Sequence, residues 1–182
     1  PPMATNFAGE DGSVNDRHIA YYLRRARAGV GYITFEHTGV LKQGRASPNM
    51  ALIDSDEKIP SFKKLVEAIH QEGGKIVIQI NHAGRQTSAS ITGSPIVAPS
   101  AIPCPVRKEM PQELSIEEIQ KIIEAFVEAA RRVKESGADG VEIHMAHGYL
   151  LNQFLSSFSN KRTDEYGGDA DRRMRMGMEV LR

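Results

Sequence analysis

Apolar residues recur at intervals of three and four along four stretches of the chain, which predicts four amphipathic helices. These helices are expected at residues 16–28, 61–72, 115–136 and 169–182. Three short apolar runs rich in β-branched residues predict strands at residues 31–36, 75–81 and 141–145. Asn15 precedes the first helix, and Ser115 with Glu118 opens the third, as residues that cap helix N-termini do.

The alternation of helices and strands predicts an α/β fold with parallel strands and right-handed crossovers. Periodicity alone does not separate an open doubly wound sheet from a barrel. Two features favour a TIM barrel: no Gly-x-Gly-x-x-Gly follows a strand, and polar residues gather after each strand, where barrels place their active sites.

The number of units predicts only part of a barrel. Residues 1–4 resemble the exit of an earlier strand, so the chain supplies about four β/α units, whereas a barrel has eight in about 250 residues. We therefore expect residues 1–182 to be a half barrel, truncated at both ends, whose unpaired strand edges favour aggregation or a homo-oligomer.

Composition narrows the function classes. Lys plus Arg and Asp plus Glu both number 23, so nothing in the overall charge favours nucleic acid or an anionic membrane as a partner. Cys104 is the only cysteine, which excludes an intramolecular disulfide and is typical of a reducing compartment. No secretory signal or bilayer-length apolar run occurs, so we expect a cytoplasmic protein.

The segment that follows the third predicted strand holds the most chemistry. His144 and His147 leave the strand near its C-terminal end, and Tyr149 follows. Imidazoles can donate hydrogen bonds to a carbonyl or an anion, and a phenol can deliver a proton. Two other interpretations stay open: structural residues with satisfied hydrogen bonds, and a metal-dependent hydrolase site, for which no third histidine lies close in sequence.

Several motifs together carry a family resemblance. The matching segments are residues 2–6, 11–14, 79–86 and 142–168. In order and spacing they resemble the N-terminal half of the old yellow enzyme family, the FMN-dependent NAD(P)H:flavin oxidoreductases that include ene-reductases, 2-enoate reductases and 2,4-dienoyl-CoA reductases. The resemblance covers almost the whole chain.

The resemblance implies a set of cofactor-binding residues. Pro2, Met3 and Ala4 match a loop that lies against the flavin ring, and Ala4 replaces the Thr or Cys that often tunes the flavin there. His37 stands where the family has a small residue whose main chain meets the flavin, so only its backbone is expected to contribute. Gln79 matches the glutamine that binds the pyrimidine edge of the flavin, and an amide offers both a donor and an acceptor.

The resemblance also implies catalytic roles. His144 and His147 match the pair that holds the substrate oxygen and the nicotinamide amide, and His144 also borders the flavin. Tyr149 matches the tyrosine that protonates the α-carbon. The implied reaction takes hydride from NADH or NADPH through FMN to a small-molecule activated alkene: an enone, enoate or enoyl thioester.

Two further expectations concern the rest of the chain. Within residues 160–168 we expect Arg162, Asp164 and Glu165 to pair with one another as scaffold. Because the family's phosphate-binding loops match nothing here, we expect the 182 residues alone to bind FMN poorly or not at all. The alternative is thus a flavin-free, inactive half barrel that self-associates through its edges.

Overall fold

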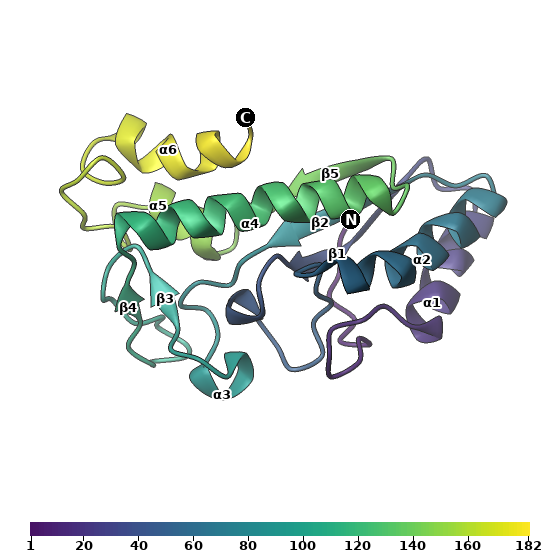
Figure 1. Cartoon of the computed structure of the whole chain (residues 1–182), viewed down its shortest axis with the longest axis horizontal. Coiled ribbons are helices and arrows are strands. Elements are labelled where there is room, and N and C mark those ends of the chain that lie inside the picture. The colour runs from purple at the N-terminus through teal and green to yellow at the C-terminus, as the bar shows by residue number, and fades with distance from the viewer.

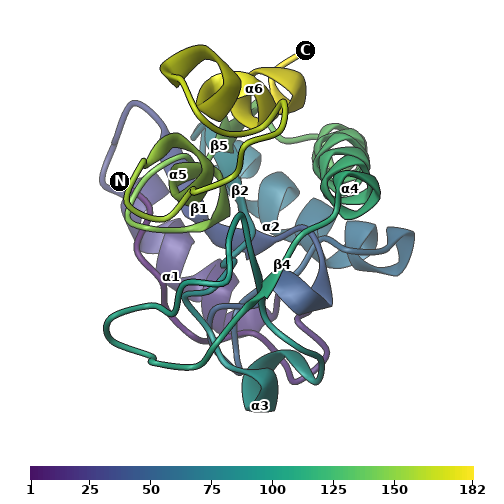
Figure 2. The same cartoon turned by 90° about the vertical axis from the view of Figure 1, so that its left-hand side faces the viewer.

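A three-stranded parallel sheet organises the chain. The computed structural model describes residues 1–182, and its strands β1 (Ile33–Gly39), β2 (Ile76–Asn81) and β5 (Gly140–Ile143) pair in the order β1-β2-β5. Strands that follow one another along the chain are thus neighbours in the sheet, as they are in a barrel. The strands point to the left in Figure 1, so Figure 2 looks onto their C-terminal ends.

Four longer helices accompany the sheet, as predicted: α1 (Asp16–Arg27), α2 (Ile59–Gln71), α4 (Ile116–Glu135) and α6 (Ala170–Val180). The predicted caps are present, because the Asn15 side chain accepts from the backbone of the first turn and Ser115 forms a capping box with Glu118. None of the helices combines the length and the apolar character needed to cross a membrane.

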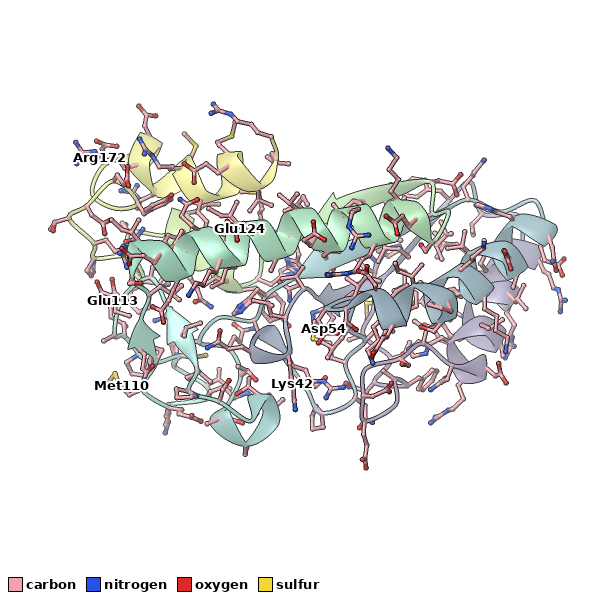
Figure 3. All side chains as sticks on the ribbon, in the orientation of Figure 1. Lys42, Asp54, Met110, Glu113, Glu124 and Arg172 are labelled. Carbon is pink, nitrogen blue, oxygen red and sulfur yellow. The ribbon has the colours of Figure 1, made fainter.

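The core lies between the sheet and the helices α1, α2 and α4. Phe35 and Ile78 of the strands pack in one cluster with Phe62 of α2 and Phe126 of α4, and all four are almost fully buried. Burying such a side chain contributes about 1.5–3 kcal/mol each. Glu124, on the opposite face of α4, points outward in Figure 3.

The connections contain elements that the apolar pattern did not predict: the helices α3 (Ala89–Thr92) and α5 (Leu150–Leu155), the short strands β3 (Val97–Ala98) and β4 (Gln112–Glu113), and the 3-10 turns Lys42–Gly44 and Asp56–Lys58. α3, β3, β4 and α5 lie at the left in Figure 1, around the C-terminal ends of the strands. α5 lies between the third predicted strand and the fourth predicted helix, where the apolar pattern predicted no helix.

Two further expectations need correction. β1 continues to Gly39 instead of ending at residue 36, and its register with β2 shifts between Phe35 and Thr38. Glu165 does not join the expected scaffold pair, because it binds Arg175 of α6 at 2.5 Å. Arg162 does pair with Asp164, at 2.6 Å.

Residues 1–4, which resembled the exit of an earlier strand, form no strand in the structure.

Candidate functional site

The predicted site residues line one cavity at the C-terminal ends of the strands. Its volume is about 300 Å³, and eight residues form it: Pro2, Met3, Ala4, His37, Gln79, His144, His147 and Tyr149. These are the eight residues that the sequence analysis singled out, and they come from four separate segments. A larger hollow of about 510 Å³ runs along the outer face of α1, but two arginines and one tyrosine are its only polar side chains. We therefore place the candidate site at the strand ends.

The two histidines that follow β5 face each other. His144 continues the strand ladder, since its backbone N–H donates to the Ile80 carbonyl at 3.1 Å. Its Nδ1 accepts from the Ala146 N–H at 3.3 Å, and its Nε2 lies 3.4 Å from Nδ1 of His147. Because Nδ1 of His144 is an acceptor, its proton resides on Nε2. His147 then carries its own proton on Nε2, where the donor is free for a ligand.

A left-handed turn sets the direction of these rings. His147 has φ 58°, a conformation that residues other than glycine seldom adopt, and Gly148 follows with φ 76°. The side chain of Asn152 in α5 closes the turn by accepting from the Gly148 N–H at 2.9 Å. Such strain persists where the surroundings hold it in place, and it is common at ligand sites.

Burial keeps His144 uncharged. Only 7% of the residue is exposed, and this desolvation, with help from the neighbouring His37 and His147, lowers its pKa to about 4. The neutral ring at pH 7 acts as a hydrogen-bond donor and contributes no fixed positive charge. The metal interpretation gains nothing from this geometry, because no group of three His, Cys, Asp or Glu side chains converges as metal ligands.

Tyr149 stands at the start of α5 with its ring in the same cavity. The ring meets His144 edge to face, with centroids 4.9 Å apart, and lies 5.4 Å from the ring of His37. Burial raises the pKa of the Tyr149 phenol above its usual value, although a hydrogen bond with Gln86 acts in the opposite direction. The phenol therefore keeps its proton at neutral pH and can donate it.

The position of His37 differs from the expectation that only its backbone would contribute. Its imidazole lines the cavity, where its centroid is 6.3 Å from that of His144. Asn81, at the end of β2, holds the ring through a contact of 3.1 Å between its Nδ2 and Nδ1 of His37. An amide nitrogen can only donate, so Nε2 of His37 carries the proton. Desolvation by burial lowers the pKa of this ring as well.

Gln79 reaches the cavity from β2. Its Nε2 donates to Glu142 at 2.5 Å across the β2–β5 pair, and the residue is 7% exposed. The carbonyl oxygen and one amide hydrogen of Gln79 have no protein partner and remain for a ligand. Glu142 and Asn81, which orient the predicted residues, were not among the predicted site residues. A sequence signal was present, because both lie inside the matching segments 79–86 and 142–168.

The comparisons with known proteins agree on one family. The NADH:flavin oxidoreductase / NADH oxidase family matches residues 1–182. The chain is 50% identical over its whole length to the NADH oxidase of Thermoanaerobacter brockii, and 44% identical to the NADPH dehydrogenase of Clostridium acetobutylicum. It covers 28% of the first relative and 53% of the second.

A solved structure gives the same result. The old yellow enzyme homologue from Zymomonas mobilis superposes with a TM-score of 0.91 at 31% identity, over 98% of this chain and 52% of that one. This likeness confirms the predicted barrel class, with the present chain as part of a barrel. The chain thus spans about half the length of the old yellow enzyme chain, and a smaller share of the oxidase.

Proposed function

The chain belongs to the NADH:flavin oxidoreductase / NADH oxidase family, and from this premise we propose that the whole protein is an FMN-dependent ene-reductase. It would take hydride from NADH or NADPH and pass it to an activated alkene, such as an enone, enoate or enoyl thioester. One observation carries the proposal: imidazole, phenol and amide side chains converge in a single cavity at the C-terminal ends of parallel strands.

The cavity fits the ring system of FMN. Gln79 offers a free amide carbonyl and an N–H, which match the alternating donor and acceptor of an imide edge. Pro2, Met3 and Ala4 supply an apolar wall against which a flat ring can lie. Ala4 has no heteroatom, so this position cannot tune the ring by a side-chain hydrogen bond. No lining residue is Lys or Arg, so the fit concerns the ring and not the phosphate.

The two histidines would polarise the substrate. FMN, when bound, supplies the two-electron redox chemistry. His147 can donate its free Nε2–H to the substrate oxygen on which negative charge develops, and the Nε2–H of His144, which lies 3.4 Å from Nδ1 of His147, would turn to the same oxygen. Donors that are already oriented cost no reorganisation during the reaction, and removing one such donor typically slows a reaction by 10²-fold or more.

Tyr149 would deliver the proton. Burial keeps its phenol protonated, and its ring packs against His144, which would hold the substrate oxygen. The phenol oxygen then transfers its proton to the α-carbon. General acid catalysis of this kind contributes about 10²–10⁴-fold to a rate.

Stopped-flow kinetics of the whole protein containing Tyr149→Phe test this role. We expect alkene reduction to slow by about 10²–10⁴-fold, while flavin reduction by the nicotinamide stays within about twofold. Tyr32→Phe is the control, because Tyr32 is an exposed tyrosine that precedes β1, at the opposite end of the sheet. Equal slowing of both half-reactions would remove the proposed role of Tyr149.

A second candidate applies to residues 1–182 by themselves: a flavin-free module that self-associates. β1 and β5 are the edges of the sheet, and every residue of β5 is only partly buried. Gel filtration with an absorbance scan tests this idea. A sharp dimer without flavin supports the module, whereas a monomer with stoichiometric FMN contradicts it.

For the whole protein we propose a cytoplasmic location, since Cys104 is a free, buried thiol.

A further inference from the structure

We propose that Glu36 is a positioning residue that fixes the Pro2–Ala4 wall of the cavity against β1. The inference rests on the proposed function, because it assigns to a buried carboxylate the placement of the wall that meets the flavin ring. Glu36 does not line the cavity. It would act through the backbone of residue 5, not by touching a ligand.

The carboxylate of Glu36 lies deep in the protein. It is 1% exposed, and both its oxygens face polar atoms of other segments. Oε2 accepts from the Thr5 backbone N–H at 2.7 Å and from the Tyr22 hydroxyl at 3.3 Å. Oε1 lies 3.5 Å from Nε2 of His18, which is completely buried. A carboxylate placed so deeply is tolerated because several donors surround it.

The tautomer of the His18 ring follows from its contact with Asn15. Nδ1 accepts from the Asn15 N–H at 3.3 Å in the capping box of α1, so Nε2 is the protonated nitrogen that faces Glu36. The Tyr22 hydroxyl accepts a hydrogen bond from the Glu36 backbone N–H at 3.1 Å and donates one to the Glu36 carboxylate. α1 therefore supplies one hydrogen-bond donor, the Tyr22 hydroxyl, and places Nε2 of His18 near Oε1 without a hydrogen bond. The second donor is the N–H of Thr5, which belongs to the N-terminal segment.

The contact with Thr5 is the first anchor after the wall. Pro1 to Ala4 take part in no hydrogen bond, so the attachment of Thr5 decides where the wall lies. Beyond it, Asn15 holds the Phe7 carbonyl at 2.5 Å. Glu36 also directly precedes His37, within the stretch where the register of β1 and β2 shifts. One carboxylate thus ties together the wall and the strand that carries a cavity imidazole.

Flavin binding by the whole protein tests the assignment. The variants are Glu36→Ala, the conservative Glu36→Gln, and Thr5→Pro, which removes the donated N–H and leaves the carboxylate in place. Asp139→Asn is the matched control. Asp139 also accepts a backbone N–H, from Ile76 at 2.9 Å, and contacts His70 at 2.8 Å, but it lies at the N-terminal ends of the strands, away from the cavity.

The readouts are the FMN dissociation constant, the visible circular dichroism of bound FMN and the melting temperature of the apoprotein. We expect Glu36→Ala and Thr5→Pro to weaken FMN binding about tenfold and to change the dichroism, since a hydrogen bond to a charged group is lost. Glu36→Gln keeps an acceptor oxygen and should give a smaller effect. Asp139→Asn should lower only the melting temperature.

Two results separate the proposals. Glu36→Ala is the main variant, and Thr5→Pro takes its place if Glu36→Ala does not fold. If the FMN affinity and the dichroism of that variant match those of the wild type, then Glu36 is structural and the inference is overturned. If the wild-type whole protein itself binds no FMN, the proposed function fails instead.

Discussion

Acid destabilisation should reveal the burial of His144. The pKa of this ring falls from the ordinary 6.5 to about 4 in the folded protein. Between these values the unfolded chain binds a proton at this position and the folded protein does not. The free energy of unfolding therefore decreases as the pH is lowered from about 6.5 to about 4, and the contribution is constant above that range.

The magnitude follows from the two pKa values. At pH 5, an unfolded histidine is almost fully protonated and the folded His144 is about one-tenth protonated, which corresponds to a loss of about 2 kcal/mol relative to pH 8. His82 is fully buried and its pKa is also about 4, so the wild type should lose a second, similar amount. A variant that removes only His144 separates the two contributions.

Urea unfolding of the apoprotein from pH 5 to pH 8 provides the measurement. The wild type and His144→Asn are compared at each pH, and carboxylates and His82 contribute equally to both. The difference between their unfolding free energies should change by about 2 kcal/mol over this range. Parallel curves would show that His144 titrates normally, and the argument for a neutral donor in the cavity would then be wrong.

Two further predictions concern the cofactor edge and the scaffold. Gln79→Leu keeps the side-chain volume, but it leaves Glu142 without its amide partner and removes the free carbonyl of Gln79. FMN titration of the whole protein should therefore show about tenfold weaker binding. Unchanged affinity would contradict the role of Gln79. Ser115→Ala removes the capping box of α4. Because Ser115 does not line the cavity, the variant should lower the unfolding free energy by about 1 kcal/mol with no change in FMN affinity.

The four longer helices and the three strands of the sheet could be predicted from the sequence because local signals mark them. The capping residues Asn15 and Ser115 fix the starts of α1 and α4, and apolar spacing defines their buried faces. α5 was missed because it spans only six residues and Tyr149 caps it without a side-chain hydrogen bond. The extension of β1 was missed because a register shift interrupts its regular pattern at Glu36 and His37.

The predicted site residues line one cavity, and their roles stay predictions; the geometry of that cavity could not be predicted from the sequence. Family resemblance supplied the eight lining residues, but the ring of His37 enters the cavity because Asn81 on the next strand holds it. Contacts between strands of this kind join residues 44 positions apart, and no local pattern encodes them. The same is true of Glu36, which reads as an ordinary strand residue until Thr5 and His18 are found around it.

The turn at Gly148 has a consequence for engineering this protein. A methyl group added to Gly148 would lie 2.8 Å from the side-chain oxygen of Gln86, and its backbone already has φ 76°. Any other residue would strain the backbone between His147 and Tyr149 and displace the side chain of Gln86, which forms a hydrogen bond with the Tyr149 phenol. Mutant libraries that aim to change substrate preference should therefore vary Ala4 or His37 and leave this glycine constant.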